Sequence, residues 1–298
     1  MKIGIVGAPV DLGQQRRGVD MGPSAIRIAK LREGLEELGH SVRDFGNIPA
    51  ADMATASVGD KSVRYLPDVV AQCEALASKV ADAVHQGLFP LVLGGDQSTS
   101  IGTFAGLART NPRQGIIWLD AHGDFNTTRT TPSGNIHGMA LAAILGYGHP
   151  KLTRLGGVSP KAVEENTVLI GGRSFDPDEA EAISKSKVKV YTMKEIDELG
   201  MKKVMSEAIK IAGTGVDDVH LSFDVDVVDP REAPGTGTPV RGGITYREAH
   251  LAMEMLSDSE KVTSAEFVEV NPILDTSNHT AELAVELAHS LFGKRIIP

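Results

Sequence analysis

The chain has 298 residues, of which 41% are hydrophobic and 23% charged, and its formal net charge is -9. This composition is ordinary for a globular protein, and the length is sufficient for a large hydrophobic core. An acidic chain without basic clusters argues against nucleic acid or an anionic membrane surface as a partner. Cys73 is the single cysteine, which excludes an intrachain disulfide, so we expect a cytoplasmic protein.

The N-terminal residues 1–7 lead directly into a predicted strand and lack the longer apolar region of a signal peptide. No window approaches the roughly eighteen apolar residues that a membrane-spanning helix needs. We therefore expect no membrane insertion.

Short apolar runs alternate along the chain with longer amphipathic segments. The apolar runs predict strands at residues 3–7, 42–45, 89–93, 115–119, 168–170, 188–191, 219–223 and 262–270. The amphipathic segments predict helices at residues 23–38, 66–86, 100–109, 137–145, 178–186, 193–211 (broken near Gly200), 245–256 and 281–292. Because no repeat or linker interrupts this pattern, we expect residues 1–298 to form a single domain.

Strand–helix alternation predicts an α/β fold in which helices cover both faces of a parallel sheet. Five acidic residues stand at or just after the ends of predicted strands: Asp96, Asp120, Asp176, Asp224 and Glu269. Ligands bind at the carboxyl ends of the strands in such sheets, so these residues are expected to meet at one edge. A closed barrel of strands gives the same convergence. We favour the open sheet because the first helices and loops are irregular in length.

Two acidic motifs directly follow buried strands. Asp120, His122 and Asp124 occupy alternate positions, as do Asp224 and Asp226. Alternate residues of an extended segment point the same way, so each set faces one point. Surface acids in a turn would explain one such motif, but two motifs after two buried strands favour a metal site.

The segment 224–229 is not a calcium-binding EF-hand loop. That loop requires Gly at its sixth position and Glu at its twelfth, where this chain has Asp229 and Gly235.

Four carboxylates and one imidazole suit two divalent cations better than one. Oxygen-rich ligands with some imidazole favour Mn²⁺, with Zn²⁺, Fe²⁺ and Co²⁺ as competitors. Two such ions generate hydroxide near neutral pH and stabilise a charged transition state. The motifs alone thus predict hydrolysis of a polar C–N or P–O bond, and a phosphatase remains open at this point.

Three segments together resemble the signatures of the ureohydrolase family: Gly94-Gly95-Asp96-Gln97-Ser98, Asp120-Ala121-His122-Gly123-Asp124 and Ser222-Phe223-Asp224-Val225-Asp226-Val227-Val228-Asp229-Pro230. Further segments resemble its arginase branch: Gly18-Val19-Asp20-Met21-Gly22-Pro23, Ser133-Gly134-Asn135-Ile136-His137-Gly138-Met139, Gly237-Thr238-Pro239-Val240 and Glu269-Val270-Asn271-Pro272. The segments occur in the family's order and span nearly the whole chain.

This resemblance implies an eight-stranded parallel sheet flanked by helices. It also implies two Mn²⁺ per chain and hydrolysis of L-arginine to L-ornithine and urea, by attack of a metal-bridging hydroxide on the guanidinium carbon. The family further suggests a homo-oligomer, a trimer or hexamer.

By the same resemblance, Asp120 and Asp224 would bridge both ions. Asp124 would complete the first ion, and His122 with Asp226 the second. Asp124 would also hold the hydroxide and accept its proton during the reaction.

The remaining site residues are also implied by the resemblance. His137 would shuttle protons to the leaving amine, and Glu269 would bind the guanidinium group. Substrate recognition would involve Asn126, Thr131, Ser133, Asp176 and Thr238. Taken alone, these are ordinary turn residues, and His137 is a histidine in a Gly-rich loop.

One position departs from the family pattern. The family has His after Gly-Gly-Asp as a ligand of the first ion, and this chain has Gln97. An amide oxygen is a neutral donor and a poorer ligand than imidazole. We therefore expect Gln97 to be a weak or lost ligand, with the first ion bound less tightly, and expect its neighbour Asp96 to orient a ligand or cap the next helix.

Two alternatives to an arginine hydrolase remain from the sequence. One is an agmatinase or another guanidino hydrolase, and the other is a metal-depleted, non-catalytic family member. A dinucleotide-binding oxidoreductase would share the α/β pattern, but no G-x-G-x-x-G motif follows the first strand.

Overall fold

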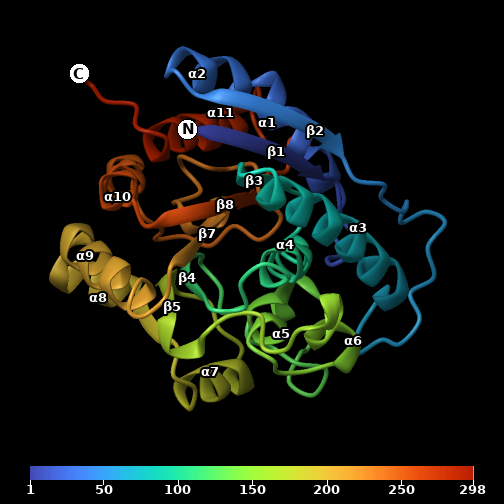
Figure 1. Cartoon of the computed structure of the whole chain (residues 1–298). Coiled ribbons are helices and arrows are strands. Elements are labelled where there is room, and N and C mark those ends of the chain that lie inside the picture. Colours follow the sequence, from blue (N-terminus) through green and yellow to red (C-terminus); the bar gives the residue numbers. More distant parts are fainter. Residues whose placement is uncertain (298) are drawn as a thin grey trace.

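The computed structural model describes residues 1–297, whose eight strands form one parallel sheet between two helical layers (Figure 1). The strands are β1 (Lys2–Ala8), β2 (Ser41–Asn47), β3 (Phe89–Gly94), β4 (Gln114–Leu119), β5 (Thr167–Gly172), β6 (Lys189–Thr192), β7 (Asp218–Asp224) and β8 (Val262–Val268). Their order across the sheet is β2-β1-β3-β8-β7-β4-β5-β6. The expected open α/β sheet is confirmed, and the barrel is not formed.

Eleven α-helices connect the strands within these residues. They are α1 (Gly22–Ile28), α2 (Leu31–Glu37), α3 (Leu66–His85), α4 (Thr99–Ala108), α5 (Ala140–Ile144), α6 (Pro150–Thr153), α7 (Pro177–Ser184), α8 (Met193–Leu199), α9 (Met201–Ala212), α10 (Tyr246–Ser259) and α11 (His279–Leu291). In Figure 1, α8 to α11 lie along one side of the sheet and α3 to α6 along the other.

The strands are buried on both faces, which explains their nearly continuous apolar sequences. In β4, Ile117 and Leu119 pack in the same core as α9, α10 and α11, whereas Ile116 and Trp118 pack with α3, α4 and α5. Successive side chains of a strand point to opposite faces, so one short strand contributes to both cores.

The single helix expected over residues 23–38 is wrong. The structure has two helices, α1 and α2, separated at Lys30, whose φ of 64° lies in the left-handed region. The turn lets Leu31 and Leu35 of α2 reach the same core as Ile26 of α1. Tertiary packing thus overrides the helical periodicity. The expected helix at residues 137–145 is also shorter, with a 3-10 turn at His137–Met139 before α5.

Strand register brings the acidic motifs together at the carboxyl edge. Leu119 of β4 is paired with Phe223 of β7, so the next residues, Asp120 and Asp224, are neighbours across the sheet. Asp224 is paired in turn with Val268 of β8, which directly precedes Glu269.

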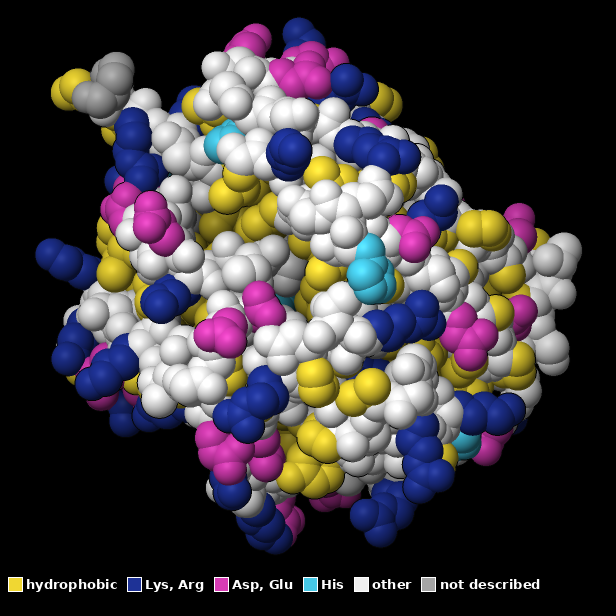
Figure 2. Space-filling view, in the orientation of Figure 1, with side chains coloured by type: hydrophobic (Ala, Val, Ile, Leu, Met, Phe, Trp, Pro, Cys, Tyr) yellow, Lys and Arg dark blue, Asp and Glu magenta, His cyan; other side chains and the backbone are white. Residues whose placement is uncertain are grey.

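Two further features concern the outside of the molecule. Lys and Arg side chains are interspersed with Asp and Glu over the face shown in Figure 2. None of the helices within residues 1–297 is both long and apolar enough to cross a bilayer.

Candidate active site

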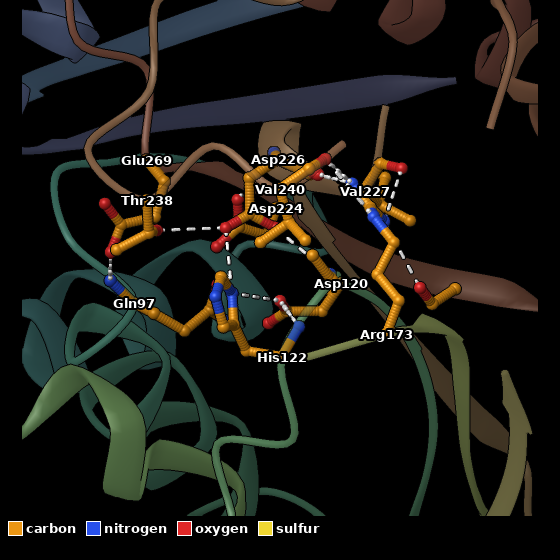
Figure 3. A network of polar contacts seen from close by, with 12 residues as sticks. Gln97, Asp120, His122, Arg173, Asp224, Asp226, Val227, Thr238, Val240 and Glu269 are labelled. Carbon is orange, nitrogen blue, oxygen red and sulfur yellow. Dashed lines mark hydrogen bonds and ion pairs between the residues drawn. The ribbon is translucent and has the colours of Figure 1, made fainter. Parts of the chain in front are cut away.

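Asp120, His122 and Asp226 form the centre of the site at the carboxyl edge of β4 and β7. Their donor atoms lie within 4.8 Å of one another, close enough to share one metal ion. His122 Nδ1 lies 3.0 Å from Asp226 Oδ2 and 3.5 Å from Asp120 Oδ1. Figure 3 shows the imidazole between these two carboxylates. The structure therefore brings together residues that are about a hundred positions apart in the sequence.

Local hydrogen bonds hold these carboxylates in place. Asp120 accepts from the indole Nε1 of Trp118 at 3.0 Å and from the backbone N–H of His122 at 2.7 Å. Asp226 accepts from the backbone N–H of Ala121 at 3.1 Å and from the hydroxyl of Thr238 at 3.0 Å. The first motif thus holds its own Asp120 and, through the Ala121 N–H, Asp226 of the second motif, which favours a preorganised site.

The cluster concentrates negative charge away from water. Burial, together with the charge of Asp226, raises the pKa of Asp120 to about 6. Burial and the charges of Asp226 and Asp120 raise the pKa of Asp224 well above its usual value. Burial disfavours the charged form of His122, but Asp226 and Asp120 outweigh it and raise its pKa to about 12. These shifts reflect how strongly the buried carboxylates repel one another and attract a positive charge.

Asp124 and Gln97 supply further oxygen atoms beside this cluster. Within residues 1–297, Asp124 Oδ2 and Gln97 Oε1 are buried without a hydrogen-bond partner. A buried acceptor without a donor is costly, and a cation would satisfy both oxygens. Asp124 also has a φ of 48°, a strained value that is typical of functional positions. The donor set therefore fits divalent cations that prefer oxygen ligands.

Arg173 was missed by the sequence analysis and anchors the loop after β7. Its guanidinium donates to the backbone carbonyls of Asp226 at 2.6 Å, Val227 at 3.1 Å and Val240 at 2.9 Å. Figure 3 shows this guanidinium directed at the loop rather than at the carboxylates. Its position directly after β5 is the sequence signal that could have identified it.

Glu269 directly follows β8 at the carboxyl edge of the sheet and is fully buried. Its Oε1 accepts from the backbone N–H of Gln97 at 2.9 Å, and its Oε2 accepts from the Gln14 amide at 2.9 Å. The His137 ring lies 3.1 Å from Oε1. Glu269 has a φ of 63°, so its backbone is held in a strained conformation. Gln14 gives no motif signal, because its partner is 255 residues away.

Asp96 performs a supporting role in this region. It accepts from the backbone N–H of Gly13 at 2.7 Å and of Ser98 at 2.9 Å. It thereby ties the loop after β1 to the turn that leads into α4. Of the two roles expected for Asp96, capping of the next helix is wrong, because Ser98 is the N-cap residue of α4.

A cavity of about 130 Å³ opens beside the cluster. Its wall includes the metal-ligand candidates His122, Asp124 and Asp224, together with His137 and Thr238. Its wall also includes every residue expected to bind the substrate head group: Asn126, Thr131, Ser133 and Asp176. The structure therefore places the head-group candidates and part of the metal-ligand candidates around one space, whereas Gln97, Asp120, Asp226 and Glu269 are not part of its wall.

Asn126 and Asp176 interact directly in this cavity wall. Asn126 Nδ2 donates to Asp176 Oδ2 at 2.9 Å. Within the described part of the chain, the Asn126 amide oxygen is buried without a partner. An ammonium group placed here would be accepted by both side chains, whereas the second Nδ2 hydrogen of Asn126 suits a carboxylate.

Four further cavity residues were missed by the sequence analysis: Asn135, Gly138, Ser174 and Glu179. Glu179 accepts from the backbone N–H of Phe125 at 2.8 Å and of Asp176 at 3.1 Å. The latter contact forms a capping box at the start of α7, with Asp176 as the N-cap residue. The sequence Asp176-Pro-Asp-Glu179 carries that capping signal, so Glu179 was identifiable as a cap, although not as a cavity residue.

Comparison with known proteins identifies the family. The model of the arginase family matches residues 1–293. The chain belongs to the arginase family.

Similar proteins cover this arginase-family chain almost end to end. An arginase from Bacillus caldovelox is 55% identical over 296 residues, covering 99% of each chain. The native structure of the Bacillus caldovelox arginase at pH 5.6 has a TM-score of 0.96 and covers 99% of each chain. The structure of Entamoeba histolytica arginase in complex with L-ornithine has a TM-score of 0.90 at 31% identity, covering 98% of this chain and 99% of that one.

Proposed function

We propose that this arginase-family chain hydrolyses L-arginine to L-ornithine and urea with two Mn²⁺ ions. The observation that carries the proposal is the shared cavity, whose wall contains His122, Asp124 and Asp224 together with the head-group candidates Asn126, Thr131, Ser133 and Asp176. Family members more than half identical to this chain are named arginase, which favours arginine over agmatine as substrate.

The first ion would be held by Gln97, Asp120, Asp124 and Asp224, and the second by His122, Asp120, Asp224 and Asp226. This assignment is supported by the burial of the four carboxylates and by the close approach of Asp120, His122 and Asp226. When bound, a pair of divalent cations supplies a hydroxide near neutral pH and Lewis acidity at the reacting carbon.

The residues of the chain position the guanidinium group and move protons. Glu269 would accept hydrogen bonds from the guanidinium N–H groups, because an ionised carboxylate is a pure acceptor. Asp124 would take up the proton released as the nucleophile adds. His137 would then deliver a proton to the leaving amine. These two groups line the same cavity, so proton transfer needs no movement of the chain over long distances.

The head-group residues would fix the far end of the substrate. Asn126, Thr131 and Ser133 would donate to the α-carboxylate, and Asp176 would accept from the α-ammonium. Thr238 would hold Asp226 in place through its hydroxyl contact, at the guanidinium end. Recognising both charges of the amino acid would select arginine over guanidino compounds without a carboxylate.

Urea release with Mn²⁺ present tests the proposal. We expect turnover of L-arginine well above that of agmatine, and loss of turnover in Asp224→Asn, which removes a shared ligand. Equal or better turnover of agmatine would support the agmatinase alternative. Absence of urea from either compound, with two ions bound, would support a non-catalytic member.

We propose further that the chain acts in the cytoplasm as a homo-oligomer, a trimer or hexamer. The single, buried Cys73 is compatible with a reducing compartment. Light scattering of the purified protein at micromolar concentration measures the assembly, and a monomer would overturn that part of the proposal.

A further inference from the structure

Gln97 stands where the family carries a metal-binding histidine, and its side-chain amide has an asymmetric environment. Its Nε2 atom donates to Ser100 Oγ at 2.8 Å and to Ser222 Oγ at 2.9 Å. Gln97 is only 1% exposed, and within residues 1–297 its Oε1 atom has no hydrogen-bond partner. The chain therefore satisfies one end of the amide and leaves the other end open.

The hydrogen bonds of Ser100 and Thr103 determine which position of the Gln97 amide is nitrogen and which is oxygen. Ser100 donates its single hydroxyl proton to Glu266 Oε1, and Thr103 donates to Glu266 Oε2 at 2.7 Å. A hydroxyl that has given its proton to a carboxylate can only accept from its next neighbour. An NH₂ group must therefore face Ser100, and a flipped amide would place two acceptors against each other.

The state of Glu266 supports this direction of donation. Burial raises the pKa of Glu266, but the nearby His220 imidazole and the Ser100 and Thr103 hydroxyls outweigh it and lower the pKa below its usual value. His220 Nε2 lies 3.5 Å from Glu266 Oε1, and both residues are fully buried. Glu266 is thus an ionised acceptor that holds the Ser100 proton.

Ser222 defines where the free oxygen points. Ser222 and Asp224 are alternate residues of β7, so their side chains share one face of the strand, with Asp224 nearer the carboxyl edge. The amide nitrogen faces Ser222, on the inner side. The amide oxygen is therefore the end of the side chain that faces neither Ser100 nor Ser222. Figure 3 shows the Gln97 side chain extending from the Glu269 side toward His122.

We infer that Ser100 and Ser222 position Gln97 Oε1 as a neutral oxygen ligand of the first ion, which makes that ion site selective for oxygen-preferring cations. This inference rests on the proposed dinuclear site. A neutral amide oxygen in place of an imidazole nitrogen favours Mn²⁺ over softer, nitrogen-preferring cations such as Zn²⁺. Ser100 and Ser222 are positioning residues, because they act only through Gln97.

The test is metal binding by the purified full chain, measured by calorimetry and by electron paramagnetic resonance of the Mn²⁺ pair. Gln97→Leu should weaken the first Mn²⁺ by at least about tenfold. Gln97→His should tighten it and raise the fraction of Zn²⁺ bound in a competition between equal concentrations of Zn²⁺ and Mn²⁺. Ser222→Ala should weaken the first Mn²⁺ by roughly tenfold to hundredfold, with the second ion retained.

Ser290→Ala is the matched control. It removes a buried hydroxyl from α11, where Ser290 contacts His250 Nδ1 at 2.8 Å, away from the Gln97 network. It should leave both Mn²⁺ affinities unchanged. Circular dichroism and thermal melting confirm that each variant is folded before its affinity is interpreted.

Two outcomes would overturn the inference. One is a Gln97→Leu chain that is folded and binds both Mn²⁺ ions as tightly as the parent. The other is an unchanged Zn²⁺ to Mn²⁺ ratio in Gln97→His. Urea release by the parent chain is measured separately: its absence with two bound ions would overturn the proposed function and leave the ligand inference standing.

Discussion

The Nδ1 atom of His137 lies 3.1 Å from Oε1 of Glu269, and both side chains are buried or nearly so. Because an ionised carboxylate only accepts, Nδ1 carries a proton in this contact and Nε2 is left for other partners. The contact links the residue proposed to protonate the leaving amine with the residue proposed to hold the guanidinium group. It also keeps the imidazole oriented, as a carboxylate partner does for catalytic histidines elsewhere.

The first prediction concerns His137→Asn. Losing a positioned acid or base costs about 10² to 10⁴ in rate, so we expect kcat for L-arginine to fall by that factor. Burial lowers the pKa of His137, but the hydrogen bond and charge of Glu269 outweigh it and raise the pKa above its usual value. The protonated form therefore persists to higher pH, and the parent should lose activity as pH rises through that pKa. This high-pH decline should be absent from the residual activity of the variant.

The control for His137→Asn is its metal content. Two Mn²⁺ per chain in both proteins would show that the loss arises in proton transfer. A variant that keeps more than about a tenth of the parental kcat would contradict the assigned role.

The second prediction concerns the repulsion among the carboxylates. Burial and neighbouring charges raise the pKa of Asp224 above its unfolded value, so the stability of the metal-free fold falls as pH rises from the ordinary carboxyl pKa to the raised one. Asp224→Asn should therefore raise the melting temperature of the metal-free protein at pH 7. It should also remove the stabilisation by Mn²⁺, which for the parent is about 2.7 kcal/mol at a hundredfold excess over Kd. Thermal melts with chelator and with Mn²⁺ measure both effects, and a lower melting temperature of the metal-free variant would refute the repulsion argument.

The carboxylates of the metal site could be predicted from the sequence because they directly follow apolar strand segments. Asp120 and Asp224 each follow an apolar strand, and parallel strands end at one edge of the sheet. Their direct juxtaposition required the strand order, in which β7 is inserted next to β4. Sequence spacing carries no information on that insertion, so the motifs indicated convergence but not which residues would touch.

The remaining features depend on contacts between distant residues. Gln14 meets Glu269 across 255 positions, and Gln97 meets Ser222 across 125. Glu266 lies inside a strand that reads as apolar, and only the structure shows its hydroxyl donors. Lys30 adopts a left-handed backbone that its sequence does not encode, because the packing of Leu31 and Leu35 selects it. Such features follow from tertiary packing rather than from local propensity.

The third prediction distinguishes recognition of the substrate α-carboxylate from recognition of its α-ammonium group. Ser133→Ala should lower kcat/KM for L-arginine by roughly tenfold to hundredfold, since it removes a donor to the α-carboxylate. It should leave agmatine almost unaffected, because agmatine lacks that carboxylate. Asp176→Asn should weaken both substrates, since both carry the amine. Asparagine preserves the N-cap of α7, so the fold is maintained. Parallel assays of urea release from L-arginine and agmatine measure these changes. An equal loss of kcat/KM for both substrates in Ser133→Ala would exclude the carboxylate contact.

The fourth prediction lies outside the active site and concerns Lys161, a fully buried lysine. Its Nζ donates to the backbone carbonyls of Leu152 at 3.1 Å and Thr153 at 2.5 Å. Burial lowers the pKa of Lys161 from 10.5 to about 8. Between these two pH values the unfolded chain binds the proton and the folded chain does not, so this residue makes stability rise with pH.

Lys161→Met should remove that dependence. Other groups also titrate in this range, so the measured quantity is the difference in the free energy of unfolding between parent and variant. This difference should shift in favour of the parent by on the order of 3 kcal/mol from about pH 8 to above pH 10. Lys202→Met, on the exposed surface of α9, is the matched control and should show no such shift. Urea-induced unfolding at several pH values measures the free energy of unfolding of the parent and the variant. A difference between these two free energies that stays constant with pH would mean that Lys161 titrates normally in the folded protein.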